Sequence, residues 1–321
     1  MKDTILYGDC RETLCAFLPQ TARVCVTSPP YYGLRNYGGE DSQIGQEQTP
    51  EEFIDELVKV FREVRNVLTD DGTCWVNLGD SYYNYRPGRG QGLAKQTVSN
   101  TKQDLPDVCP RRGNRLEGLK EKDLIGIPWM FAFAMRADGW YLRQDIIWHK
   151  PNPMPESVKD RCTKSHEYIF LFSKNKKYFY DNEAIKEPAK DWGTRDRTKG
   201  NYHNEGTGLQ PHSGLSKSYP TKNKRSVWTI TNKPYRGAHF AVYPPDLIEP
   251  CIKAGSEIGD IVLDPFMGSG TPAAVANSLG RDYIGCELHE DYGNLIQKRI
   301  REYHPVEEVS QETGVNILDL I

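Results

Sequence analysis

The stretch from Asp260 to Leu279, DIVLDPFMGSGTPAAVANSL, contains the turn that is most informative about the fold. It begins with an apolar, β-branched run, which predicts a strand, and ends with an Ala-rich run, which predicts a helix. Gly268 and Gly270 lie between the two, where glycine allows a tight turn and the close approach of a ligand. The N-terminus of the following helix offers free N–H groups to an anion. We therefore expect a ligand site at this turn.

Two details narrow the kind of ligand. No lysine follows Gly270, which excludes the phosphate-binding P-loop. Glu287 closes the next strand-like run, from Asp282 to Cys286, and a carboxylate there can accept hydrogen bonds from both hydroxyls of a ribose. The pattern favours a ligand that contains a ribose.

Strand and helix signals alternate along the rest of the chain. Thr49 and Glu52 have the spacing of a capping box at the start of a helix, and Asp70-Asp71-Gly72 predicts its end. Alternation predicts a mostly parallel sheet covered on both faces. The predicted strands are 4–7, 22–26, 73–78, 140–148, 168–173 with a hairpin partner at 178–180, 227–230, 260–263 and 282–286, and the predicted helices are 50–68, 127–135, 245–254, 271–279 and 291–303.

Two polar segments interrupt this pattern, at 82–122 and 186–226. Residues 86–115 contain seven basic and two acidic residues, and residues 190–225 contain eight basic and three acidic residues, so each carries a net charge of +5. The whole chain has a net charge of −3, so the remaining residues are strongly acidic. Basic loops on an acidic scaffold favour binding of a polyanion such as nucleic acid, although solvated loops would give the same composition.

The bulk composition excludes several classes of protein. The chain has 321 residues, and no apolar run approaches the roughly 18–20 residues that span a membrane. The first seven residues contain no signal-peptide core, so we expect a cytoplasmic protein without membrane contact. None of the eight cysteines forms a Cys-x-x-Cys pair or a cluster with zinc spacing. We therefore expect reduced, structural cysteines and no metal site.

A second informative stretch is Thr27-Ser28-Pro29-Pro30-Tyr31-Tyr32, which follows the strand at 22–26. Proline fixes φ and donates no hydrogen bond, so the carbonyl groups of this segment point in set directions. Fixed acceptors beside aromatic rings suit a flat ligand with an exocyclic amino group, which presents two donors. We call residues 28–31 the clamp. The alternative is a proline-rich turn without chemistry.

Together, and in this order, the clamp and the Gly-rich turn resemble the motifs of amino-group DNA methyltransferases that use S-adenosylmethionine. The catalytic half comes first, as in the circularly permuted members. The resemblance implies a Rossmann-like α/β methyltransferase fold with a mostly parallel, doubly wound sheet. It further implies one domain built from a catalytic half at 1–185, which carries the basic insertion 82–122, a target-recognition insertion at 186–226, and a cofactor-binding half at 227–321.

The resemblance also implies roles for single residues. The catalytic residues would be Ser28, Pro29, Pro30 and Tyr31. The Ser28 side chain and the Pro29 carbonyl would accept the amino hydrogens, and Tyr31 would stack on a base flipped out of the duplex. The cofactor-binding residues would be Asp9, Cys10, Asp264, Phe266, Gly268, Ser269, Gly270, Thr271, Glu287 and His239.

The resemblance leaves two alternatives for the atom that accepts the methyl group, cytosine N4 and adenine N6. Family members with Ser at the first clamp position mostly methylate cytosine N4, and those with Asp mostly methylate adenine N6, so Ser28 favours cytosine. The rival functions are an RNA methyltransferase and a non-catalytic DNA-binding protein that keeps the fold. The expected partner is double-stranded DNA. A homodimer and a separate cognate restriction endonuclease are further partners that the resemblance allows.

Overall fold

The computed structural model describes residues 2–33, 43–83, 116, 118–189, 220–232 and 243–303. In these ranges the strands are β1 (Thr4–Tyr7), β2 (Ala22–Thr27), β3 (Leu68–Leu78), β4 (Tyr141–His149), β5 (His166–Ser173), β6 (Glu187–Pro188), β7 (Thr221–Lys222), β8 (Val227–Thr229), β9 (Ile261–Asp264) and β10 (Asp282–Glu287). The helices are α1 (Cys10–Thr13), α2 (Pro50–Val67), α3 (Ile127–Ala137), α4 (Pro245–Gly255), α5 (Thr271–Ser278) and α6 (Gly293–Glu302), with short 3-10 turns at Leu14–Ala16, Glu183–Ile185 and Glu290–Tyr292.

Eight of the described strands form one sheet in the order β1-β10-β9-β2-β3-β5-β4-β8. The β1, β10, β9, β2 and β3 pairings are all parallel. Only β5 runs against its neighbours β3 and β4, and β8 is again parallel to β4. The prediction of a mostly parallel α/β sheet is therefore confirmed. Both halves of the sequence supply strands to this sheet, because β9 and β10 lie between β1 and β2.

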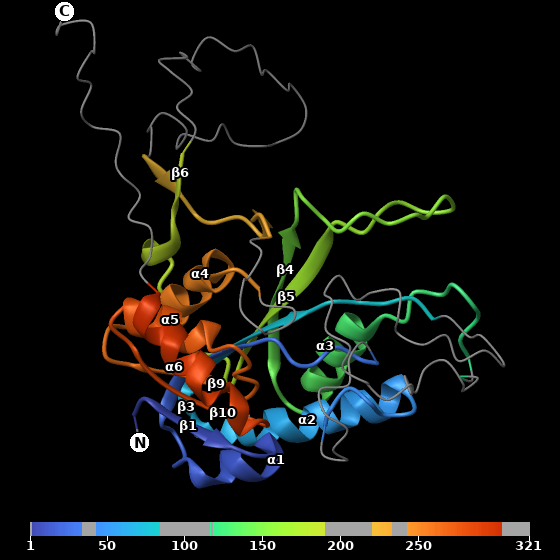
Figure 1. The fold of residues 1–321 in the computed structure, drawn as a ribbon. Helices are drawn as coiled ribbons and strands as arrows, with labels where there is room; N and C mark the ends of the chain where they lie inside the picture. The colour runs from blue at the N-terminus through green and yellow to red at the C-terminus, as the bar shows by residue number, and fades with distance from the viewer. Residues whose placement is uncertain are drawn as a thin grey trace, which may run out of the picture.

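Helices cover both faces of the sheet (Figure 1). On one face α1, α2 and α3 pack over a core that includes Phe61, Phe131 and Phe172. On the other face the α4, α5 and α6 helices pack over Val24, Trp75 and other sheet residues. Cys25 of β2 points to the first core and its neighbours Val24 and Val26 point to the second. Both cores are buried, which is why this part of the strand is apolar on both faces.

The capping box at the start of α2 is confirmed. The Thr49 side chain accepts a hydrogen bond from the Glu52 backbone N–H at 3.1 Å, and the Glu52 carboxylate accepts one from the Thr49 N–H at 3.2 Å. Each contact satisfies an N–H group that the first helical turn would otherwise leave unpaired.

Two local predictions are wrong. The strand after α2 begins directly at Leu68, and the predicted break at residues 70–72 lies inside it. The register with β2 jumps from Ala22 opposite Leu68 to Val24 opposite Thr73, so these polar residues form a bulge rather than a separate turn. The second error is the hairpin partner at 178–180, which is not a strand. β5 already has β3 and β4 on its two sides, so no edge is left for that partner.

The predicted site residues lie along one edge of the sheet. Because β1, β2, β3, β4, β9 and β10 run in the same direction, their carboxyl ends lie together, along with the amino end of the reversed strand β5. The predicted site residues follow these ends: Asp9 follows β1, Ser28 follows β2, and Asp264 and Glu287 end β9 and β10. In open α/β sheets this edge is where ligands bind.

Candidate functional site

The Gly-rich turn between β9 and α5 adopts a backbone that depends on glycine. Gly268 and Gly270 have φ of 53° and 79°, in the left-handed region that other residues avoid. A Cβ on Gly270 would lie 2.6 Å from the Ile296 side chain in α6. The turn is also tied to β10, because the Met267 N–H donates to the Cys286 carbonyl at 2.9 Å. The Gly-rich turn is therefore held in place by its contacts with α6 and β10.

Asp264 is buried at the start of this turn, with 1% of its surface exposed. Its Oδ1 accepts hydrogen bonds from the Thr27 hydroxyl at 2.6 Å and the Phe266 N–H at 3.0 Å. Its Oδ2 is buried and has no hydrogen-bond partner among the described residues. Burial raises the pKa of this carboxyl to about 7, although the bonds from Thr27 and Phe266 lower it in part. The site thus contains a buried carboxylate with one unused oxygen.

Glu287 lies beside the same turn, and its carboxylate bonds to the backbone. Oε2 accepts from the Gly268 N–H at 2.7 Å and Oε1 from the His289 N–H at 3.0 Å. Burial raises the pKa of this carboxyl. The sequence predicts that Glu287 accepts from a ribose and that the Gly268 region meets a carboxylate, whereas here the two groups pair with each other. Each carboxylate oxygen of Glu287 has a second lone pair that can accept a further hydrogen bond.

The remaining residues of the turn differ in exposure. Phe266 is half-buried, and Ser269 and Thr271 are buried. The Ser269 hydroxyl accepts a hydrogen bond from the Arg299 guanidinium of α6 at 2.5 Å, and it lies 3.5 Å from the Thr271 hydroxyl. Arg299 was not among the predicted residues, because in sequence it looks like one of several solvent-exposed cations on an amphipathic helix.

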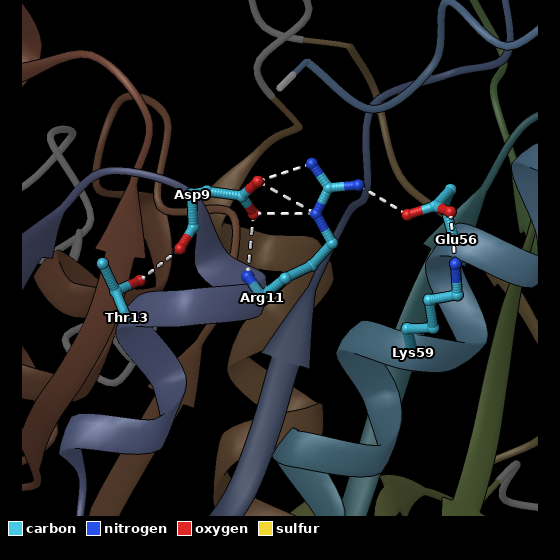
Figure 2. Close-up of polar contacts among 5 residues, drawn as sticks. All are labelled: Asp9, Arg11, Thr13, Glu56 and Lys59. Atoms are coloured by element: carbon cyan, nitrogen blue, oxygen red, sulfur yellow. Dashed lines mark hydrogen bonds and ion pairs between the residues drawn. The ribbon is translucent and has the colours of Figure 1, made fainter. Parts of the chain in front are cut away.

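Asp9 follows β1 and caps the short helix α1, accepting from the Arg11 N–H at 2.9 Å (Figure 2). The Arg11 guanidinium also bonds both Asp9 oxygens and reaches Glu56 of α2 at 2.5 Å. Cys10 is buried beside this group, and burial raises the pKa of its thiol. Asp9 is therefore fixed by an ion-pair network from two helices, of which the sequence indicated neither Arg11 nor Glu56.

The clamp lies at the carboxyl end of β2. Ser28 is partly exposed and Pro29 is buried. The Ser28 hydroxyl lies 3.5 Å from the Asn77 side-chain oxygen of β3. The Tyr31 hydroxyl donates to Glu167 of β5 at 2.8 Å and lies 3.4 Å from the same Asn77 oxygen. The clamp is thus supported by polar side chains from two other strands.

Asn77 and Glu167 were not among the predicted residues. Asn77 carried a usable signal, since it is a polar residue inside the apolar run Trp75-Val76-Asn77-Leu78. Glu167 had none, because its position beside Tyr31 depends on the pairing of β5 with β3, which periodicity does not specify.

One predicted residue, His239, and most of the two basic segments lie outside the described residues. The two clamp prolines follow β2 and the glycines of the Gly-rich turn follow β9, so they lie at the same edge of the sheet as Ser28 and Asp264.

In the described ranges, no group of three or more His, Cys, Asp or Glu side chains could hold a metal ion. Within those ranges, too, no helix has the length and apolar character of a membrane span.

Comparison with known proteins connects this geometry to a family. The chain matches the model of the N6/N4 methyltransferase family, described as DNA methylase, over residues 22–298. It is 45% identical over 298 residues to the type II methyltransferase M.XycI of Xanthomonas campestris pv. cyanopsidis, a match that covers 93% of this chain and 87% of that protein.

Two solved structures share the fold. The PvuII DNA methyltransferase, cytosine-N4-specific, gives a TM-score of 0.61 at 18% identity and covers 93% of this chain and 86% of its own. TTHA0409 of Thermus thermophilus, in complex with S-adenosyl-L-methionine, gives a TM-score of 0.57 at 23% identity and covers 94% of each chain. Because the family match takes in both the clamp strand and the Gly-rich turn, and the relative aligns along nearly the whole chain, this protein belongs to the N6/N4 DNA methylase family.

Proposed function

We propose that this DNA methyltransferase transfers a methyl group from S-adenosylmethionine to the exocyclic amino group of one base in a specific DNA sequence, with cytosine N4 as the acceptor. The observation that carries the proposal is the 2.6 Å hydrogen bond from Thr27 to Asp264. These residues lie 237 positions apart in the chain. Their bond joins the strand that leads into Ser28 to the strand that leads into the Gly-rich turn. A base on the clamp and a cofactor on the turn would therefore be neighbours.

The residues around Asp264 fit this cofactor. The buried Oδ2 of Asp264 has no partner among the described residues, and a buried carboxylate oxygen is costly unless a donor or a cation satisfies it. The half-buried aromatic ring of Phe266, two residues further along the turn, favours a cation as well. The Gly-rich turn and the N-terminus of α5 suit the carboxylate at the other end. Held by these residues, S-adenosylmethionine would supply a methyl group on a positively charged sulfur.

The clamp residues would prepare the amino group for attack. In a free base the amino lone pair is delocalised into the ring, which makes the nitrogen a weak nucleophile. Acceptors placed tetrahedrally around its hydrogens favour a nitrogen with more sp3 character. The Ser28 hydroxyl and the Pro29 carbonyl can serve as these acceptors, because the proline ring fixes the backbone. Catalysis then depends on positioning and electrostatics rather than on a covalent intermediate.

Two observations support cytosine N4 over adenine N6. The first clamp position is Ser28 rather than Asp. The PvuII enzyme, which shares this fold, is cytosine-N4-specific by name. Adenine N6 is the alternative acceptor, and it would keep every other part of the mechanism.

The relative M.XycI is a type II methyltransferase, and we propose that this chain likewise protects a short DNA site from a separate restriction endonuclease. Sequencing of DNA methylated by the purified protein tests the site specificity that such protection requires. One short motif modified at every occurrence is the expected result, and scattered modification would contradict it. We also propose that the protein forms a homodimer, which sedimentation with and without DNA tests.

The deciding experiment is incubation of the purified protein with labelled S-adenosylmethionine and unmethylated genomic DNA, followed by digestion to nucleosides and mass analysis. N4-methylcytosine is the expected product. Detection of N6-methyladenine would change the assigned acceptor base to adenine and leave the proposed mechanism unchanged. Label in structured RNA but not in DNA would refute the proposed substrate, and no label in either would leave a non-catalytic DNA-binding role.

A substitution tests the role of the clamp. Ser28→Ala removes one acceptor, and we expect methyl transfer to fall by about 10²-fold, in the range of other lost transition-state hydrogen bonds, while cofactor binding persists. Ser278→Ala at the far end of α5 is the matched control, because its hydroxyl donates to the Val275 carbonyl within the helix, away from the clamp. Equal loss of transfer and cofactor binding in Ser28→Ala would argue for a disrupted fold.

A further inference from the structure

The position of the Tyr31 ring is set by two strands that are remote from the clamp in sequence. Its hydroxyl donates to Glu167 of β5 at 2.8 Å. On the β3 side, a Cβ added to Gly79 would lie 2.7 Å from Cε2 of the ring, so this glycine gives the ring room to pack against the backbone. The ring is therefore placed by contacts at its hydroxyl and at its edge.

Glu167 is in turn held from a second side. Its other oxygen, Oε1, accepts a hydrogen bond from the Lys150 ammonium. Both side chains are largely buried, at 17% and 15% exposure, so water screens this pair less than it screens a surface pair. The ammonium also lies 4.0 Å from the centroid of the Trp148 ring, a cation–π contact. The Glu167 carboxylate thus connects the Tyr31 hydroxyl to the Lys150 ammonium.

The backbone beneath these side chains is rigid. Trp148 pairs with Glu167 and His149 pairs with His166 in the antiparallel ladder of β4 and β5. The Lys150 N–H extends the ladder by donating to the Ser165 carbonyl at 2.7 Å. Groups mounted on strands are held more closely in place than groups on loops. Glu167 and Lys150 therefore give Tyr31 a fixed support.

We propose that Glu167, supported by Lys150, is a positioning residue that locks the Tyr31 ring in the orientation in which it receives the target base. Glu167 acts through Tyr31 and touches no reacting atom. Without the carboxylate, the ring has to be ordered when the base arrives, and the entropy lost at that point raises the barrier to methyl transfer. This inference rests on the proposed function of the clamp.

Glu167→Gln is the variant that tests it. The amide has the same shape but carries an NH2 group in place of one accepting oxygen. Tyr31 and Lys150 bond to different oxygens of the carboxylate, so in this geometry the amide can accept from only one of them. We expect the single-turnover rate of methyl transfer to DNA to fall about tenfold, the effect of losing one hydrogen bond to a charged group. The affinity for S-adenosylmethionine should not change. Glu183→Gln is the matched control, because Glu183 is an exposed partner of Lys186 on a surface turn.

A double-mutant cycle separates positioning from a general structural effect. Tyr31→Phe removes the hydroxyl that Glu167 holds, so the double variant should be no slower than Tyr31→Phe alone. Fluorescence of a 2-aminopurine probe at the target position should show the same non-additivity in base stacking. If Glu167→Gln unfolds the protein, Lys150→Met in the same cycle is the second route, with a smaller expected loss.

The outcomes distinguish this inference from the proposed function. An active wild-type protein with an equally active Glu167→Gln variant overturns the inference alone. So does a double variant whose loss is the product of the two single losses. A wild-type protein that transfers no methyl group to DNA overturns the proposed function, and the inference falls with it.

Discussion

Asp264→Asn isolates the energetic effect of burying a carboxylate under the Gly-rich turn. The amide keeps an oxygen that can accept from Thr27 and from the Phe266 N–H, so the local geometry is preserved. What it removes is the negative charge, which burial penalises in this carboxyl. We expect the substitution to change how the stability of the ligand-free protein depends on pH.

The magnitude follows from the shift in pKa. The pKa of Asp264 rises from 3.8 to about 7 on folding. At about 1.36 kcal/mol per pKa unit, the ionised group costs the folded state on the order of 4 kcal/mol at about pH 8. Because the folded state binds the proton more tightly, the cost is absent below about pH 4, develops as the pH rises toward about 7, and is constant above that. The buried amide of the variant adds a constant cost of about 1–3 kcal/mol for its unpaired N–H groups.

Urea denaturation of both proteins from about pH 5 to about pH 8 is the assay, with the free energy of unfolding compared at each pH. Other titrating groups contribute to both proteins and largely cancel in the difference. The stability of Asp264→Asn relative to wild type should rise with pH and level off above about 7. If the difference in unfolding free energy between the two proteins stays constant across this range, the pKa of Asp264 is not raised. If the difference falls as the pH rises, the pKa of Asp264 is lowered by folding instead.

Two further predictions concern the supports of the cofactor site. Gly285→Ala should destabilise the protein by about 1–3 kcal/mol, since the added Cβ would lie 2.5 Å from the Asp264 backbone carbonyl, and thermal unfolding with a normal Tm would contradict it. Arg11→Met removes the guanidinium that holds Asp9 and Glu56, so we expect weaker binding of S-adenosylmethionine by isothermal titration while the fold persists. Unchanged affinity would show that Asp9 needs no such support, or that it does not meet the cofactor.

Much of the fold was predictable because its signals are local. The capping box of Thr49 and Glu52 and the period of α2 involve residues within a few turns of each other. The strand-to-helix turn at 264–271 was equally clear, since glycine is needed where φ is positive. The wrong predictions, at 70–72 and 178–180, both concern strand pairing. A polar Gly-containing run predicts a turn from sequence, but the register of β2 against β3 makes it a bulge instead.

The two motifs, the class of fold and the family that the comparisons then showed could all be read from the sequence, because short motifs with fixed spacing depend on the chemistry of their own backbone. The groups that surround the two motifs depend instead on the tertiary structure. Thr27 meets Asp264 because β2 pairs with β9, and Tyr31 meets Glu167 because β5 pairs with β3. Side chains distant in sequence become neighbours through sheet order, which depends on burial of both faces at once rather than on any local pattern.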